Sequence, residues 1–287
     1  PVDAENYTIT APSLKVAYTI GNNLYYADGE NQVQVTYNPE NVVAGQSVHR
    51  NEFAINGGIF WSPDGKKLAY YSMDESMVSD YPLVDITERV ATAKPIKYPM
   101  AGMTSHIVTL KVYNTENAEE TTIKTGEPAD QYLTSITWNP DSERVYIGIL
   151  NRGQNHLQFN EYCTLSGDYI QTVFEDRDEQ YVEPVGPAHF LPNNTKEFLW
   201  LAQRDGFYHV WKHNVETKEA KQITKGDFVI TAFEGFDKKG DNIYYTSTEV
   251  SPLERHFYKH NLKNGKKVKI SKEHGTHSVK PSASGKY

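Results

Sequence analysis

Four polar residues stand together directly before an apolar run: His49, Arg50, Asn51 and Glu52. Polar and ionisable residues on a connection between rigid elements are where binding chemistry tends to sit. The Glu52 carboxylate can bind an ammonium group through charge-assisted hydrogen bonds. We therefore take Glu52 as the main candidate binding residue, with Arg50 and Asn51 beside it. The competing interpretation is a solvated loop glutamate, or an ion-pair partner of Arg50.

A second, weaker candidate of the same kind is the stretch that holds Tyr181 and Glu183, which also precedes a strand-like run. Other chemically capable residues favour structural roles. His106, His189 and His209 lie beside strand-like runs, and we expect them to be structural. The single cysteine, Cys163, lies in a strand-like run, and we expect an inert, buried thiol.

Sequence motifs of common catalytic and cofactor sites are absent. The chain has no Gly-x-Ser-x-Gly, His-Glu-x-x-His, P-loop or Gly-x-Gly-x-x-Gly. One cysteine excludes an internal disulfide and a Cys-based zinc site. The net charge of −8, without a basic patch, argues against nucleic-acid binding. No apolar run approaches the ~20 residues of a membrane helix. We therefore expect no metal, no cofactor, no nucleic-acid partner and no membrane span in this chain.

A proline-containing turn recurs along the chain and organises its strand-like runs. Trp61-Ser62-Pro63-Asp64-Gly65 has counterparts at 138–142, 190–194 and 236–240, with the tail of one at 11–18 and the opening of another at 282–285. When the repeats are aligned at the position that proline occupies in most of them, positions 12, 63, 140, 192, 238 and 283 are 51, 77, 52, 46 and 45 residues apart. A period of about 45–50 residues with several short strands is typical of propeller blades.

The fold class that this repeat predicts is all-β. We find no long helical period, and we expect a partial β-propeller of about five blades of four antiparallel strands, with incomplete terminal blades. The whole chain, 1–287, forms this propeller portion. The spacing of 77 marks an insertion at about 74–105, whose mix of apolar and proline residues is unlike a floppy linker. It is either a long ordered loop or an arm that packs on a partner subunit.

Several motifs, taken in order, resemble the propeller region of the prolyl oligopeptidase clan. The nearest branch is the dipeptidyl peptidase IV subfamily, which includes the prolyl tripeptidyl aminopeptidases of Bacteroidetes-type bacteria. The matching stretches span nearly the whole chain, at 48–53, 60–65, 73–78, 98–102, 181–184, 204–206 and 251–258. The family architecture is an eight-bladed propeller joined to an α/β-hydrolase domain with a Ser-Asp-His triad.

This resemblance implies a role for Glu52. In the dipeptidyl enzymes a Glu-Glu pair on this segment holds the α-amine of the substrate, whereas here a single acid, Glu52, follows Arg50 and Asn51. The tripeptidyl branch is similar in offering one glutamate, so the resemblance leans towards tripeptide release and puts dipeptide release in doubt. An anchored ammonium fixes the distance from the N-terminus to the scissile bond.

The resemblance also implies the wider context of the chain. We expect a fragment of a secreted, periplasmic or cell-surface bacterial serine exopeptidase that cleaves proline-containing peptides. The first blades and the α/β-hydrolase domain are absent from this chain, which is therefore expected to be inactive alone. The insertion corresponds to the arm through which such enzymes form homodimers. The alternative is a non-catalytic β-propeller interaction module, because propellers host many functions.

Overall fold

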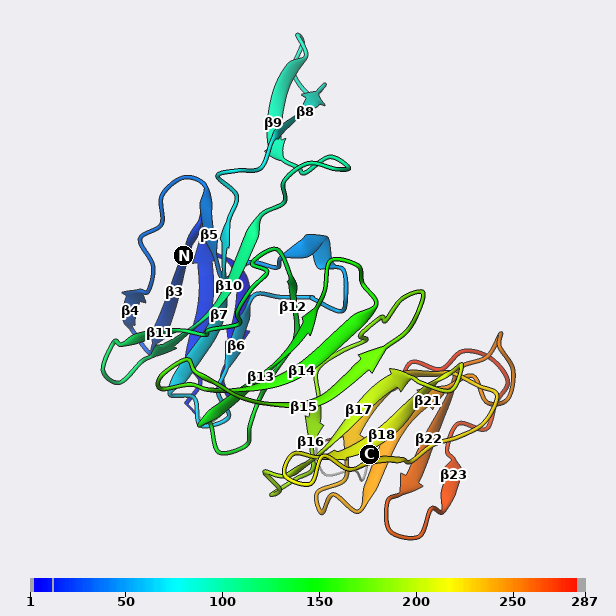
Figure 1. Ribbon diagram of the computed structural model, residues 1–287. Helices are drawn as coiled ribbons and strands as arrows, with labels where there is room; N and C mark the ends of the chain where they lie inside the picture. Colours follow the sequence, from blue (N-terminus) through cyan, green and yellow to red (C-terminus); the bar gives the residue numbers. More distant parts are fainter. Residues whose placement is uncertain (1–2, 12, 283–287) are drawn as a thin grey trace.

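The computed structural model describes residues 3–11 and 13–282. Within them the regular structure consists of strands and one short 3₁₀ turn, which confirms the predicted all-β class. Five antiparallel sheets follow one another along an arc, with the first and the fifth at opposite ends (Figure 1). Each sheet is one propeller blade.

The strands of the five blades are as follows. Blade 1 is β1 (Glu5–Ile9), β2 (Val16–Ile20), β3 (Asn23–Asp28) and β4 (Asn31–Gln34). Blade 2 is β5 (Val42–Ala44), β6 (Ile59–Trp61), β7 (Lys67–Asp74), β10 (Ile107–Asn114) and β11 (Glu120–Thr122). Blade 3 is β12 (Tyr132–Trp138), β13 (Arg144–Leu150), β14 (His156–Cys163) and β15 (Tyr169–Arg177). Blade 4 is β16 (His189–Phe190), β17 (Glu197–Gln203), β18 (Tyr208–Asn214) and β19 (Ala220–Gln222). Blade 5 is β20 (Ile230–Phe236), β21 (Asn242–Ser247), β22 (His256–Asn261) and β23 (Lys267–Lys269).

The recurring turn closes the first hairpin of its blade, as its chemistry predicts. In blade 2 it joins β6 to β7, and the Ser62 hydroxyl donates to Asp64 at 2.6 Å and accepts from the Lys67 backbone N–H at 2.9 Å. Gly65 has a φ of +70°. That left-handed conformation is readily available to glycine, because it has no Cβ.

The expectation of incomplete terminal blades is wrong, since blades 1 and 5 each have four paired strands. Strand β1 is not predicted from the sequence, because it is largely exposed and carries no apolar run. The expected opening of a further blade at 282–285 lies almost wholly outside the described residues.

The hydrophobic core lies between successive blades. One cluster joins blades 1 and 2 and includes Leu24 and Tyr70, and the next joins blades 2 and 3. A third fills the space between blades 3 and 4 around Phe159 and Trp200, and a fourth joins blades 4 and 5. Each sheet is therefore covered by its neighbours in sequence, as stacked repeats require.

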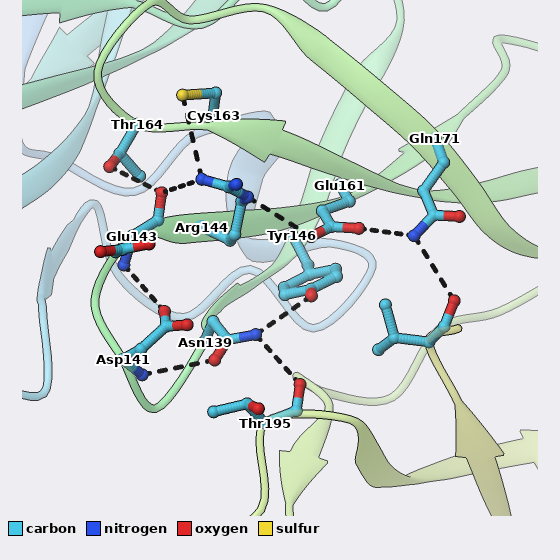
Figure 2. Close-up of polar contacts among 11 residues, drawn as sticks. Asn139, Asp141, Glu143, Arg144, Tyr146, Glu161, Cys163, Thr164, Gln171 and Thr195 are labelled. Atoms are coloured by element: carbon cyan, nitrogen blue, oxygen red, sulfur yellow. Dashed lines mark hydrogen bonds and ion pairs between the residues drawn. The ribbon is translucent and has the colours of Figure 1, made fainter.

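Polar contacts also tie blade 3 to blade 4 (Figure 2). The Asn139 side-chain amide donates to the Thr195 carbonyl at 3.2 Å, and the Gln171 side-chain amide donates to the Val215 carbonyl at 3.4 Å. Cys163 ends β14 beside Arg144 and is partly exposed, so the prediction of a buried thiol is wrong. Backbone N–H groups, first that of Ser166, lower the pKa of this thiol.

The interval expected to hold an insertion contains β8 (Asp80–Asp85) and β9 (Thr92–Lys97), which pair with each other in a separate two-stranded sheet. This hairpin, called the arm below, projects away from the five blades (Figure 1). Its outer part exposes apolar side chains: Val84 is 67% exposed, Ile86 80% and Val90 76%.

Candidate functional site

Glu52 lies in a loop that interrupts the first strand of blade 2. Strands β5 and β6 lie along the same partner, β7, where β5 pairs with residues 72–74 and β6 with residues 68–70. Between them the chain leaves the sheet, runs through residues 46–57, and returns. We call this excursion the Glu52 loop. It contains the 3₁₀ turn η1 (His49–Asn51).

One residue of β7, Tyr71, holds both ends of this loop. The Gly45 N–H donates to the Tyr71 carbonyl at 2.9 Å, and the Tyr71 N–H donates to the Gly58 carbonyl at 3.0 Å. The two sides of the loop then touch, because a Cβ built on Gly58 would lie 2.0 Å from the Gln46 carbonyl oxygen. Real Cβ atoms do not approach oxygen so closely, so glycine at position 58 allows the loop to close.

The backbone of the loop is unusual for residues with side chains. His49, Arg50 and Asn51 have φ of +49°, +57° and +61°, and Phe53 and Ala54 have φ of +56° and +60°. A left-handed residue with a Cβ costs on the order of 1–2 kcal/mol. Such strain persists where the surroundings over-determine the conformation, and it clusters at binding sites.

The surroundings that hold this loop are buried aromatic contacts. His49 is 6% exposed, and its ring centroid lies 4.8 Å from that of Tyr132, at the start of β12 in blade 3. The Phe53 ring lies 4.6 Å from the same tyrosine. His49 Nδ1 and His106 Nε2 are 3.0 Å apart, and Thr134 donates a hydrogen bond to the Phe53 carbonyl. The loop is thus fixed to blade 3 on both sides of Glu52.

Burial keeps this histidine pair neutral. Desolvation, followed by the charges of His106 and Arg152, lowers the pKa of His49 to about 3. Desolvation likewise lowers the pKa of His106. Near neutral pH one ring nitrogen therefore donates and the other accepts. The prediction that His106 is structural is consistent with this buried pair.

Glu52 itself is exposed and follows directly on η1. Its backbone N–H donates to the His49 carbonyl at 3.1 Å, and its carbonyl accepts from the Ile55 N–H at 3.1 Å. Within residues 3–11 and 13–282 its carboxylate has no hydrogen bond or ion pair. A carboxylate held on a rigid loop without an internal partner can accept hydrogen bonds from an external ammonium group.

The two residues beside Glu52 lie differently. Asn51 is exposed, and its Oδ1 accepts from the Ser47 hydroxyl within the loop. Arg50 turns towards the base of the arm, where its guanidinium carbon lies 3.8 Å from the centroid of the Tyr98 ring. No ion pair joins Arg50 to Glu52 in the part of the chain described, which removes one of the competing interpretations of Glu52.

Tyr181 and Glu183 lie on the connection between β15 and β16 and line a cavity between blades 3 and 4. The Tyr208 hydroxyl lies 3.3 Å from a carboxylate oxygen of Glu183. Burial and then the Glu183 charge raise the pKa of Tyr208 to about 12. The same cavity is lined by Asp176 and Arg204, which form a 2.6 Å ion pair. It is thus a charged and largely polar recess.

The Glu52 loop and the connection that holds Tyr181 and Glu183 are linked through Gln154 and Tyr132. The Gln154 carbonyl accepts from the Val182 N–H at 2.7 Å, and the Gln154 side-chain amide lies 3.5 Å from the Tyr132 hydroxyl. Tyr132 in turn contacts Phe53. No sequence motif marks this path, and within residues 3–11 and 13–282 no hydrogen bond joins Glu52 to Tyr181 or Glu183.

Sequence reasoning missed the residues that hold Glu52 in place. Tyr98 and Tyr132 follow Glu52 by 46 and 80 positions. These separations are too long for any local spacing to connect the two tyrosines to the loop. The positive φ values were equally hidden, because residues 49–54 include no glycine.

The described residues contain no group of three or more side chains suited to hold a metal ion. None of their helices is long and apolar enough to cross a membrane.

Comparisons with known proteins give a consistent result. The family model for the dipeptidyl peptidase IV N-terminal region matches residues 4–287. The chain is 27% identical to dipeptidyl peptidase 4 of Felis catus, covering 88% of this chain and 37% of that protein. It is 28% identical to a probable dipeptidyl-aminopeptidase B of Phaeosphaeria nodorum, covering 90% and 33%. The chain thus spans about a third of the length of these curated relatives.

Two solved structures are also similar. A crystal structure of a putative dipeptidyl aminopeptidase IV from Bacteroides ovatus matches with a TM-score of 0.91 at 38% identity, covering 100% of this chain and 43% of that one. Dipeptidyl peptidase 4 of Porphyromonas gingivalis matches with a TM-score of 0.85 at 26% identity, covering 95% of this chain and 39% of that one.

Proposed function

The chain belongs to the dipeptidyl peptidase IV family, as part of its N-terminal region, and on this basis we propose that it is the propeller portion of a serine exopeptidase. The complete protein would remove N-terminal dipeptides or tripeptides after proline, with its triad in an α/β-hydrolase domain. The propeller would gate the substrate cavity and bind the substrate amino terminus.

The observation that carries this proposal is the exposed Glu52 carboxylate on a strained loop that is fixed from behind by buried rings. A rigidly held carboxylate fixes the position of the bound ammonium group. The distance from that group to the scissile bond then decides how many residues are released. Arg50 and Asn51 flank this carboxylate. Tyr181 and Glu183 would contact the substrate further along, at the recess between blades 3 and 4.

The wider context follows from the same family. We expect the protein to be secreted, periplasmic or attached to the cell surface, and to form a homodimer through the arm. The exposed apolar side chains of the arm support this dimer, since large unpartnered apolar surface is a usual mark of protein contacts.

Product mapping on the full-length protein tests the proposal. Peptides with proline at position two or three, each with a free or an acetylated amine, would be incubated and their products identified by mass spectrometry. We expect cleavage after proline of the free-amine peptides, and weak or no cleavage of the acetylated ones. The 287 residues alone should cleave neither. Equal cleavage of free and acetylated peptides would contradict amine anchoring, and no cleavage by the full-length protein would favour a non-catalytic interaction module.

A further inference from the structure

The return segment of the arm, residues 97–106, borders η1 at two places. At one place Arg50 stacks on Tyr98, with its guanidinium carbon 3.8 Å from the ring centroid, and its Nη2 lies 3.4 Å from the Lys97 carbonyl oxygen. At the other, His106 Nε2 lies 3.0 Å from His49 Nδ1. The consecutive residues His49 and Arg50 therefore contact opposite ends of the segment 97–106.

The arm end of this contact is itself held in place. The Lys97 ammonium lies 3.0 Å from Asp80 and 3.1 Å from the Val78 carbonyl oxygen, which ties β9 to the start of β8. The Tyr98 N–H donates to the Ser79 carbonyl at 3.0 Å, and its ring lies 5.7 Å from that of Tyr81. Arg50 therefore stacks on a surface that the hairpin has already ordered.

Glu52 lies two residues beyond Arg50 and one before Phe53. His49 and Phe53 fix the buried side of the loop through Tyr132, but these contacts do not restrain its exposed side. Arg50 does so, because its side chain reaches Tyr98 and Lys97 at the base of the hairpin. A guanidinium is suited to this contact, since its plane stacks on an aromatic face while its N–H groups remain free to donate.

We propose that Arg50 is a positioning residue, which fixes the direction of the Glu52 carboxylate by clamping η1 to Tyr98 and Lys97 at the base of the arm. This inference rests on the proposed function, because it assigns to Arg50 an effect on amine binding through Glu52. In this account the arm contributes to substrate specificity. A change at Tyr98 or Lys97 would alter the direction of the Glu52 carboxylate, although neither residue contacts Glu52.

The test uses the full-length protein with three substrates: a prolyl peptide with a free amine, its acetylated form, and a small ester without an amine. The variants are Arg50→Gln, Arg50→Lys, Tyr98→Leu and the double variant Arg50→Gln/Tyr98→Leu. Tyr98→Phe is the matched control, because it keeps the ring.

Arg50→Gln and Tyr98→Leu should each raise KM for the free-amine peptide roughly tenfold, the loss expected for one cation–π contact, with kcat unchanged. Turnover of the ester should not change. Since both residues act through one contact, the double variant should be no worse than either single variant. Tyr98→Phe should behave as wild type, and Arg50→Lys should fall in between. Amide hydrogen exchange should rise together at 48–55 and 97–104.

Three results would overturn the inference. One is an unchanged KM in Arg50→Gln, another is additive loss in the double variant, and the third is equal loss on the peptide and the ester, which indicates general unfolding. Glu52→Gln measured alongside separates this inference from the proposed function. If Glu52→Gln abolishes the preference for the free amine while Arg50 and Tyr98 variants keep it, only the positioning role fails. If Glu52→Gln also keeps it, the proposed anchor itself fails.

Discussion

Truncation of Tyr132 to alanine should both destabilise the protein and release the Glu52 loop. Tyr132 is 7% exposed, and its ring contacts those of His49 at 4.8 Å and Phe53 at 4.6 Å. Removal of a buried aromatic side chain costs about 3–5 kcal/mol. Part of this loss comes from the two ring contacts, at about 0.5–1.5 kcal/mol each. We therefore expect the free energy of unfolding to fall by roughly 3–5 kcal/mol.

Urea denaturation of the chain measures this loss, and hydrogen exchange at residues 48–55 measures the release of the loop. Tyr132→Phe is the matched control, because the hydroxyl has only a long contact of 3.5 Å to Gln154. It should cost less than about 1 kcal/mol. If Tyr132→Ala costs no more than this control, or leaves exchange at 48–55 unchanged, blade 3 does not hold the loop.

Three further predictions concern the histidines, the loop closure and the arm. Burial lowers the pKa of His49 and His213 to about 3, and that of His189 to about 4, from an ordinary value of 6.5. As the pH falls towards 6.5 and below, these histidines therefore bind protons in the unfolded chain but stay neutral in the folded chain. The free energy of unfolding should decrease steadily from pH 7 to pH 5. Denaturation midpoints should show this decrease, with a shallower slope in His49→Gln, and a flat profile would contradict it. Gly58→Ala should cost at least about 1–3 kcal/mol through the clash with Gln46, whereas Gly57→Ala, with nothing within 4 Å, should be nearly neutral; equal effects in urea denaturation would refute the close approach. Val84→Asp/Ile86→Asp should convert a full-length dimer into a monomer in analytical ultracentrifugation, and a wild-type monomer would remove the dimer proposal.

The sequence predicted the features that depend on local chemistry. The turn at 61–65 forms because proline, aspartate and glycine each suit one position of it, and its recurrence revealed the blades. Glu52 was identified because polar residues before a strand are visible in sequence. The blade assignment failed at β1, whose side chains are largely exposed and give no apolar signal.

What could not be predicted depends on contacts distant in sequence. The left-handed residues 49–51 are held by contacts of His49 with Tyr132 and of Arg50 with the base of the arm. The stacking of Arg50 on Tyr98 depends on the hairpin that brings residue 98 back to blade 2. Such tertiary contacts decide what a loop displays, and no periodicity encodes them.

The most direct test of the central claim compares wild type, Glu52→Gln and the control Glu30→Gln in the full-length protein. Glu30 is exposed on blade 1, so its loss should have no effect. kcat/KM would be measured on a prolyl peptide with a free amine and on its acetylated form. A charged hydrogen bond contributes about 1.5–3 kcal/mol, so Glu52→Gln should lose about 10- to 150-fold on the free-amine peptide alone. If Glu52→Gln keeps the wild-type preference for the free amine, Glu52 does not anchor the substrate amino terminus.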